Sequence, residues 1–151
     1  MRNKQTIRAL LVVAAVAAGG FALADNHAGD AEGIELAVTN YVRSLYDMKP
    51  ELLDVSVSPK LQKVGYTPAE DGSGWNESWM THQELKDLAA TLNKDGMFDP
   101  ETAPLEIEIL EHTEMIANVK LTAAWGIDYI HLVKTDGGWM IMNVVWQMAA
   151  H

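Results

Sequence analysis

Apolar residues recur every three or four positions between Asp30 and Tyr46, which is the spacing of one face of an α-helix. The repeating positions are Ile34, Ala37, Val38, Tyr41, Val42 and Leu45. Asp30 has the side chain of a helix N-cap, and Glu32 and Glu35 follow near the positive end of the helix dipole. We therefore expect a helix that begins at Asp30 and buries this face.

A second, shorter helix is expected at PELLDVSV, because Pro50 suits a first helical turn and Pro59 closes the segment. Residues 60–66 fit a short strand, and residues 67–74 have the composition of a loop.

A third helix is expected after the apolar segment 75–80. Thr81 and Glu84 have the spacing of a capping box, in which each side chain satisfies a backbone donor of the other residue. The apolar face of this helix is Leu85, Leu88, Ala89 and Leu92, and the segment 94–96 ends it with a glycine.

The period changes from helical to alternating after Asp99-Pro100, and four strands can be recognised in the remainder. They are expected at residues 105–112, 117–125, 127–135 and 139–148. Short connections favour antiparallel pairing between neighbours. Helices followed by a long strand meander predict an α+β domain, with the N-terminal helices packed on one face of a curved antiparallel sheet.

The first residues have the three parts of a secretory signal peptide. MRNKQTIR is basic, ALLVVAAVAAGGFA is apolar, and Ala22-Leu23-Ala24 supplies small residues before Asp25. An uncleaved membrane anchor is the alternative, but the apolar run is shorter than the roughly 20 residues that span a bilayer. We expect residues 1–24 to be removed and residues 25–151 to form one periplasmic or secreted domain without a stable membrane anchor.

The charge of the chain is strongly acidic, with a formal net charge of −10. Cleavage before Asp25 would also remove Arg2, Lys4 and Arg8, so the mature domain would be more acidic still. Nucleic acid is therefore not an expected partner, because phosphate binding requires a basic surface. The chain has no cysteine, which excludes disulfides and thiolate metal sites, and neither a metal site nor a cofactor is expected.

Two stretches of the chain resemble a known family. They are IELAVTNYVRSLY near the start and IDYIHLVKTDGGWMIMNVVW near the end, and the resemblance is sharpest at Asp128-Tyr129, Leu132, Lys134, Gly138-Trp139 and Ile141. They are similar to the putative lumazine-binding family of the nuclear transport factor 2-like (SnoaL-like) superfamily. The resemblance implies a cone-shaped fold with a pocket for a small organic ligand. A histidine–proline pair common in that family is Ser58-Pro59 here, so any role of the histidine is missing.

Asp128 is the main candidate for the pocket. An ionised carboxylate is costly to bury without a partner, so an aspartate in an apolar strand lies either at an exposed edge or at a site that uses it. Alternation puts Asp128, Ile130 and Leu132 on one face of the strand and His131 on the other, so Asp128 and His131 should not form a dyad. Asp128 could act as a general acid or base, or it could fix strand geometry through hydrogen bonds.

The other ligand-binding candidates are mostly aromatic residues that could stack on a planar ring. They are Tyr41, Tyr46, Trp75, Trp79 and Trp125, with Asn143 on the face of the last strand that also carries Trp139 and Ile141. The alternative for the aromatic residues is a role in the core. The opposite face of the last strand, with Met140, Met142 and Trp146, is expected to form a homodimer interface, because aromatic and methionine side chains are enriched at interfaces.

Three functions remain open. The first is an exported protein that binds a planar organic ligand without turning it over. The second is a small isomerase or dehydratase in which Asp128 is the general acid or base and Tyr41 or Tyr46 donates a hydrogen bond. The third is a purely structural or partner-binding role. No nucleophile elbow, phosphate loop or HExxH motif appears in the sequence, which argues against hydrolysis and phosphoryl transfer.

Overall fold

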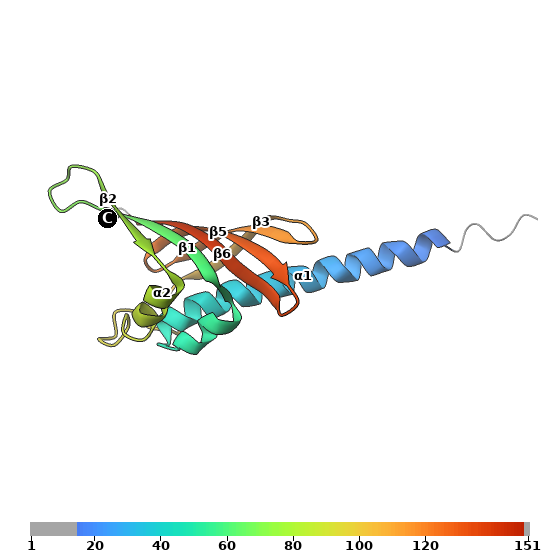
Figure 1. The fold of residues 1–151 in the computed structure, drawn as a ribbon, viewed down its shortest axis with the longest axis horizontal. Coiled ribbons are helices and arrows are strands. Elements are labelled where there is room, and N and C mark those ends of the chain that lie inside the picture. Colours follow the sequence, from blue (N-terminus) through green and yellow to red (C-terminus); the bar gives the residue numbers. More distant parts are fainter. Residues whose placement is uncertain (1–14, 150–151) are drawn as a thin grey trace, which may run out of the picture.

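The computed structural model describes residues 15–149, with side chains from Gly29 onward. Two helices, one 3-10 helix and six strands follow one another along this part of the chain (Figure 1). Their bounds are α1 Ala15–Tyr46, η1 Pro50–Val55, β1 Val57–Pro68, β2 Trp75–Met80, α2 His82–Ala89, β3 Leu105–His112, β4 Ile116–Ala123, β5 Gly126–Thr135 and β6 Gly138–Met148.

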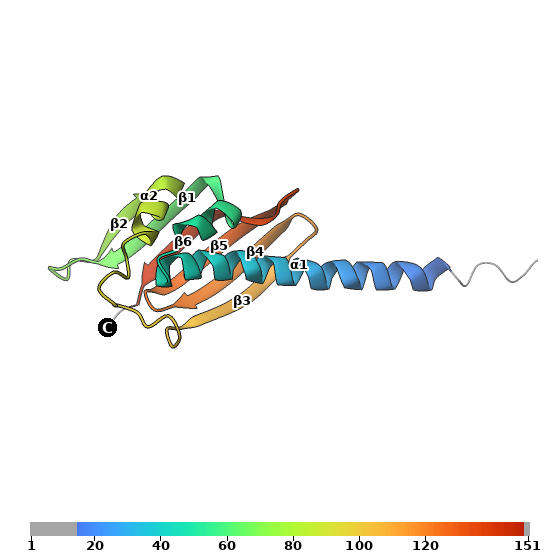
Figure 2. The ribbon, with the colours of Figure 1, turned by 90° about the horizontal axis from the view of Figure 1, so that it is seen from below.

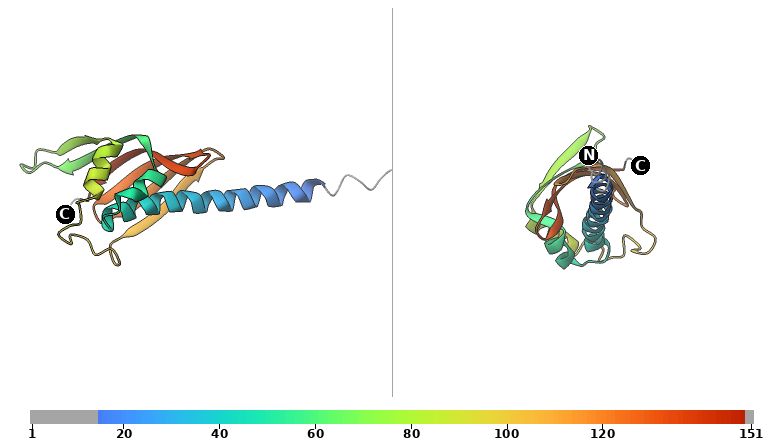
Figure 3. Two further views of the ribbon diagram at one scale, coloured as in Figure 1. Left: turned by 60° about the horizontal axis from the view of Figure 1, so that its bottom comes forward. Right: turned by 90° about the vertical axis from the view of Figure 1, so that its right-hand side faces the viewer.

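The six strands form one sheet in the order β2-β1-β6-β5-β4-β3. All neighbours pair antiparallel except β1 and β6, which are parallel. The sheet curves around α1, and η1 and α2 lie on the same side of it (Figures 2 and 3). The predicted α+β architecture, with helices on the concave face of a curved sheet, is therefore confirmed.

Helix α1 provides the centre of the core with the face that the sequence predicts. Ile34, Val38, Tyr41 and Val42 are fully buried, and they lie against the concave face of the sheet, where Leu121, Ile130, Leu132 and Ile141 are also buried. The expected start of α1 at Asp30 is wrong, because the helix runs through this residue from Ala15. The predicted leader lies partly outside the described residues, so its removal stays a prediction.

Helix α2 begins as the sequence predicts. The Thr81 hydroxyl accepts a hydrogen bond from the Glu84 backbone N–H, and the Glu84 carboxylate accepts one from the Thr81 backbone N–H. Leu85 and Ala89 anchor the helix in the core. No helix within residues 15–149 is both long enough and apolar enough to cross a bilayer.

Strand β6 contains one extra residue relative to its neighbour β5. His131 pairs with Asn143, whereas the next residue of β5, Leu132, pairs with Ile141, so Met142 has no partner. A bulge of this kind reverses the alternation of side chains that follows it. Trp139 and Ile141 before the bulge, and Val144 and Trp146 after it, consequently all lie on the concave side.

The convex side of the sheet carries an outer apolar row across four strands. The row consists of Trp79, Val64, Val145 and Tyr129, which are successive cross-strand partners on β2, β1, β6 and β5. Trp79, Val145 and Tyr129 are exposed, with Ile127 nearby on β5. The prediction that Trp146 belongs to the exposed face is wrong, because the bulge at Met142 turns it inward.

Candidate functional site

Asp128 is fully buried on the concave side of β5. Its two oxygens accept hydrogen bonds from different elements. The Tyr41 hydroxyl of α1 donates to Oδ2 over 2.9 Å, and the Trp125 indole N–H of the β4–β5 turn donates to Oδ1 over 2.7 Å. The structure thus brings together Tyr41, Trp125 and Asp128, three of the residues that the sequence suggested.

Lys63 joins this group from β1, with 5% of its side chain exposed. Its ammonium group donates to the Tyr41 hydroxyl oxygen over 2.7 Å and lies 3.7 Å from Asp128 Oδ2. Burial lowers the pKa of Lys63 to about 8 because it disfavours the charged amine, although the Asp128 carboxylate opposes this effect. Lys63 was not predicted. Its spacing of two residues from buried Leu61 was the available signal, since both side chains lie on one face of the strand.

Tyr41 links the amine to the carboxylate. Its hydroxyl accepts from Lys63 and donates to Asp128, which makes a continuous chain of three polar groups. Burial, and then the Asp128 charge, raise the pKa of Tyr41 well above its ordinary value, so this phenol stays protonated. The site can therefore hold a fixed phenol O–H beside a carboxylate and an amine with a pKa of about 8.

The indole of Trp146 covers the amine from β6. Its ring centre lies 5.1 Å from Lys63 Nζ, and the Tyr41 ring centre lies 5.3 Å from the same atom. Gly65 makes room for the indole, because a Cβ at this position would come within 1.9 Å of Trp146 Nε1. The amine is thus held between two aromatic rings, an arrangement that favours a cation.

A layer of aromatic rings fills the space beside the carboxylate. The Tyr46 ring centre lies 5.6 Å from that of Trp125 and 5.5 Å from that of Phe98, and Tyr41 contacts Trp125 edge-on at 6.2 Å. The Tyr46 hydroxyl donates to the Pro104 carbonyl and accepts from the Ala124 backbone N–H, so its ring is fixed. Residue Tyr46 therefore supports Trp125 and has no direct bond to Asp128.

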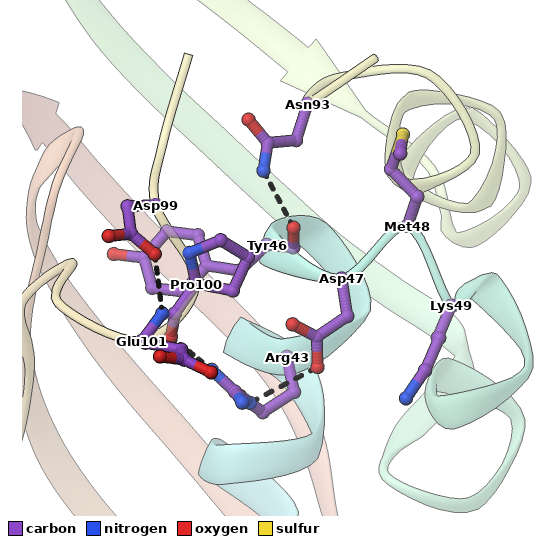
Figure 4. A pocket seen from close by; sticks show the side chains of 9 residues that line it. All are labelled: Arg43, Tyr46, Asp47, Met48, Lys49, Asn93, Asp99, Pro100 and Glu101. Atoms are coloured by element: carbon purple, nitrogen blue, oxygen red, sulfur yellow. Dashed lines mark hydrogen bonds and ion pairs between the residues drawn. The ribbon is translucent and has the colours of Figure 1, made fainter. Parts of the chain in front are cut away.

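An open pocket of about 600 Å³ lies on the other side of Tyr46 (Figure 4). Its walls come from the end of α1, the turn that follows it and the loop after α2, and they comprise Arg43, Tyr46, Asp47, Met48, Lys49, Asn93, Asp99, Pro100 and Glu101. Asn93 closes the loop by donating to the carbonyl oxygens of Tyr46 and Phe98. The pocket and the buried carboxylate are thus separated by the aromatic layer.

Three of the predicted ligand-binding residues lie away from this site. Trp75 and Trp79 are 47% and 64% exposed on the edge strand β2. Asn143 points to the convex side, where it donates to the Gln62 carbonyl and its oxygen lies 3.1 Å from His131 Nδ1. The assignment of Asn143 to the face of Trp139 and Ile141 is wrong, because it assumed uninterrupted alternation through the bulge.

Asp30 is a second buried carboxylate, and the sequence did not reveal its contacts with distant residues. Asp30 accepts hydrogen bonds from the Lys134 ammonium and, over 3.1 Å, from the Trp139 indole N–H, and so ties α1 to the β5–β6 hairpin. The hydrogen bond from Lys134 holds the pKa of Asp30 below its usual value. Within residues 15–149 there is no group of three histidine or acidic side chains that could hold a metal ion.

Solved structures with the same architecture are nuclear transport factor 2-like proteins. A protein of unknown function from Silicibacter pomeroyi is 17% identical, with a TM-score of 0.60 over 81% of this chain and 95% of that chain. One from Methylobacillus flagellatus is 21% identical, with a TM-score of 0.59 over 81% and 94%. A putative scytalone dehydratase from Novosphingobium aromaticivorans is 18% identical, with a TM-score of 0.50 over 81% and 85%. At these identities the likeness establishes the fold alone.

The fold and these likenesses define an α+β protein of the nuclear transport factor 2-like class. The family model described as "Putative lumazine-binding" matches residues 29–147, and the chain belongs to that family. No curated protein matches the sequence. The family indicates that a small molecule is bound.

Proposed function

We propose that the protein binds a small planar organic ligand inside the cone, beside Asp128, after export from the cytoplasm. The observation that carries this proposal is the fully buried Asp128 carboxylate with a phenol, an indole and an amine around it. Replacing buried polar groups by packed apolar side chains is often neutral or stabilising, so such a cluster contributes little to stability alone. Its directed hydrogen-bonding groups suit the recognition of a heteroaromatic ring.

Entry to the interior is proposed from the open pocket at the end of α1. Tyr46 belongs both to the wall of this pocket and to the aromatic layer that contacts Trp125. Phe98, the other ring of that layer, is carried by the loop that Asn93 closes. A rearrangement of this loop would move Phe98 and open a path to Trp125 and Asp128.

Native mass spectrometry of the protein isolated from its own host tests the binding function, with lumazine as the first defined probe in equilibrium dialysis. Wild type should retain a small molecule or bind the probe, and Asp128→Asn, which keeps the shape of the side chain, should bind at least tenfold more weakly. Asp30→Asn is the matched control, since Asp30 also accepts from a lysine and a tryptophan but lies outside the proposed site. Equal binding by wild type and Asp128→Asn would refute the site.

An isomerase or dehydratase is the second candidate, with Asp128 as the general base. The observation that favours it is the hydrogen bond from Tyr41 to Asp128, because a phenol beside a carboxylate can stabilise a developing oxyanion while the carboxylate moves a proton. Conversion of the retained molecule by wild type, and its absence in Asp128→Asn with unchanged folding, would establish an enzyme. Recovery of that molecule unchanged after incubation would leave the binding function.

Association as a homodimer is proposed through the outer apolar row. Exposed Trp79, Val145 and Tyr129 form an apolar strip on an acidic protein, where association requires apolar burial to offset charge repulsion. Light scattering at micromolar concentration should give the mass of a dimer, and Tyr129→Glu should give a monomer. A monomeric wild type would remove this proposal.

Export is proposed from the leader sequence. Intact-mass measurement on protein recovered from the periplasm or medium should give a chain that starts at Asp25. Recovery of a chain that still carries Met1–Ala24 would contradict it.

A further inference from the structure

The sheet ends in strands β2 and β3, and β3 is protected against pairing with another chain. An end strand presents backbone N–H and C=O groups along its free edge, and proteins limit their pairing with charged side chains and bulges. On β3, Glu106, Glu108 and Glu111 are exposed, and Leu110 has no partner on β4, so a bulge interrupts the strand. The free edge of β3 is therefore poorly suited to accept a further strand.

Strand β2 has the opposite character. Its residues, Trp75–Met80, pair with β1 without a register shift, and they include neither lysine nor proline. All of them except Met80 are exposed, including Trp75 and Trp79. The far end of the β1–β2 hairpin also projects beyond the rest of the sheet (Figures 1 and 2). A regular and largely aromatic edge of this kind is open to the addition of a strand.

The backbone of β2 is oriented for such an addition. At the closed end of the hairpin, the Ala69 N–H donates to the Gly74 carbonyl over 2.9 Å. Hydrogen-bonded and non-bonded pairs alternate along an antiparallel ladder, so the N–H and C=O groups of Trp75, Glu77 and Trp79 point away from β1. The same alternation puts these three side chains together on the convex face. A strand that paired with β2 would therefore bond to these residues and lie beside their side chains.

Glu77 gives this edge a fixed negative charge between two indoles. The Trp79 N–H donates to its Oε1 over 2.8 Å, and the Tyr66 hydroxyl donates to its Oε2 over 2.9 Å. Each carboxylate oxygen can accept a second hydrogen bond, so a further donor can join. A lysine or arginine side chain placed here would meet a carboxylate and an exposed tryptophan ring, and both attract a cation.

The charge of the chain decides which kind of strand fits. The protein has a formal net charge of −10, so its field attracts a basic partner and repels an acidic one. Two copies that paired through β2 would bring two acidic edges together, with Glu77 on each. An extended basic segment would instead complement both the backbone groups and the carboxylate.

We propose that the free edge of β2 binds an extended basic segment of another protein, which adds a strand to the sheet and places a lysine or arginine side chain against Glu77. The site lies on the outer side of the molecule and is independent of the ligand proposed for the interior. It shares Trp79 with the outer apolar row, so its test must be separated from dimer formation.

A synthetic peptide of about eight residues, in which lysine alternates with valine and both ends are blocked, is the probe. Isothermal titration calorimetry at near-physiological ionic strength limits diffuse attraction to the acidic protein. The lysine peptide should bind about tenfold or more tightly than the same peptide with glutamate in place of lysine. A version with proline in place of valine keeps the charge but cannot form a ladder, and it should also bind about tenfold more weakly. Equal affinities for the lysine and proline peptides would overturn the proposal.

Two matched variants locate the charge that is recognised. Glu77→Gln keeps the size of the side chain and should weaken the lysine peptide about tenfold with an unchanged circular dichroism spectrum. Glu106→Gln makes the same change on the convex face at the opposite edge, and it should leave the affinity unaltered. Equal effects of the two substitutions would show general charge attraction and refute the site.

Hydrogen exchange separates strand addition from other modes of binding. The amides of Trp75, Glu77 and Trp79 should exchange more slowly in the complex, and unchanged exchange at all three would overturn the proposal. Tyr129→Glu should bind the lysine peptide as wild type does, because it alters the outer apolar row outside β2. Loss of binding in that variant would place the site on the row and refute the β2 edge. A monomeric wild type that binds the peptide would remove the dimer and leave this proposal standing.

Discussion

Two buried carboxylates in this protein have nearly the same partners but different surroundings. Asp30 and Asp128 each accept a hydrogen bond from a tryptophan indole, and each lies near a lysine. At Asp30 the lysine, Lys134, bonds to the carboxylate directly and its side chain is 38% exposed. At Asp128 the Tyr41 hydroxyl bridges the two charges, and the Lys63 side chain is 5% exposed.

The difference shows how burial changes the use of one set of groups. Water reaches Lys134, so its charge is solvated. The ion pair between Lys134 and Asp30 therefore serves to connect α1 to the β5–β6 hairpin. The Lys63 ammonium is shielded from water, and its charge is stabilised mainly by Asp128 and by the rings of Tyr41 and Trp146. The first cluster should therefore respond to acid and salt, and the second to removal of a partner and to alkali.

The largest effect is expected when Asp128 is replaced by alanine. This change leaves the Tyr41 hydroxyl and the Trp125 N–H without their acceptor in the core, and the Lys63 ammonium without its counter-charge. Removal of one partner from a buried ion pair costs about 3–5 kcal/mol in the free energy of unfolding. Urea denaturation should show a loss in this range for Asp128→Ala and a smaller one for Asp30→Ala. Equal losses at the two positions would show that the clusters do not differ in the way described.

The second prediction concerns Lys63→Met and its dependence on pH. The pKa of Lys63 is lowered from 10.5 to about 8 by folding, so the unfolded chain binds more protons between these values and stability due to this residue rises with pH. Wild type should gain roughly 2–3 kcal/mol relative to Lys63→Met between pH 7 and pH 10. Because Tyr41 has a raised pKa, its contribution is lost above pH 10, so melts should stop there. A difference that is constant with pH would indicate an ordinary solvated lysine.

The third prediction perturbs the cover of the interior cluster alone. In Gly65→Ala the new methyl group would clash with the Trp146 indole and move it away from Lys63. Overpacking of this kind costs about 2 kcal/mol. Tryptophan fluorescence should shift to longer wavelength and the melting temperature should fall, while Gly29→Ala, where no atom lies within 4 Å of the added Cβ, serves as the control. Unchanged fluorescence in Gly65→Ala would contradict the placement of Trp146 over the amine.

The smallest effect is expected at Asp30, and it should appear in acid. Its pKa is lowered in the folded protein, chiefly by the hydrogen bond from Lys134, so its stabilisation is complete above the unfolded value and disappears as the pH falls through the folded value. Thermal melts of wild type and Asp30→Asn should differ at pH 6 and converge as the pH falls through the lowered pKa of Asp30. Added salt should reduce the difference at pH 6, because Lys134 is accessible to ions. A difference that persists at low pH would point to packing as its source.

The sequence predicted the elements well because their periods are regular. The buried positions of α1 from Ile34 to Leu45 and the four C-terminal strands lie where the apolar pattern places them. The meeting of Tyr41 with Asp128 could be expected only through the family resemblance, because 87 residues separate them. Lys63 and Asp30 were missed as partners, since charged residues are normally exposed and no local pattern reveals a tertiary bond. Asn143 and Trp146 were placed on the wrong faces because a bulge has no reliable signature in one sequence.

The bulge at Met142 determines which side of the sheet each later residue of β6 faces. If β6 kept Met142 and alternated without a bulge, the positions after it would exchange sides, so that Asn143 and Val145 would enter the interior and Val144 and Trp146 would leave it. Deletion of Met142 would instead make Ile141 and Asn143 neighbours, as their partners Leu132 and His131 already are, so Trp146 would stay over Lys63 and the outer apolar row would keep its side of the sheet. The concave and convex faces of β6 beyond the bulge therefore both depend on this one unpaired residue.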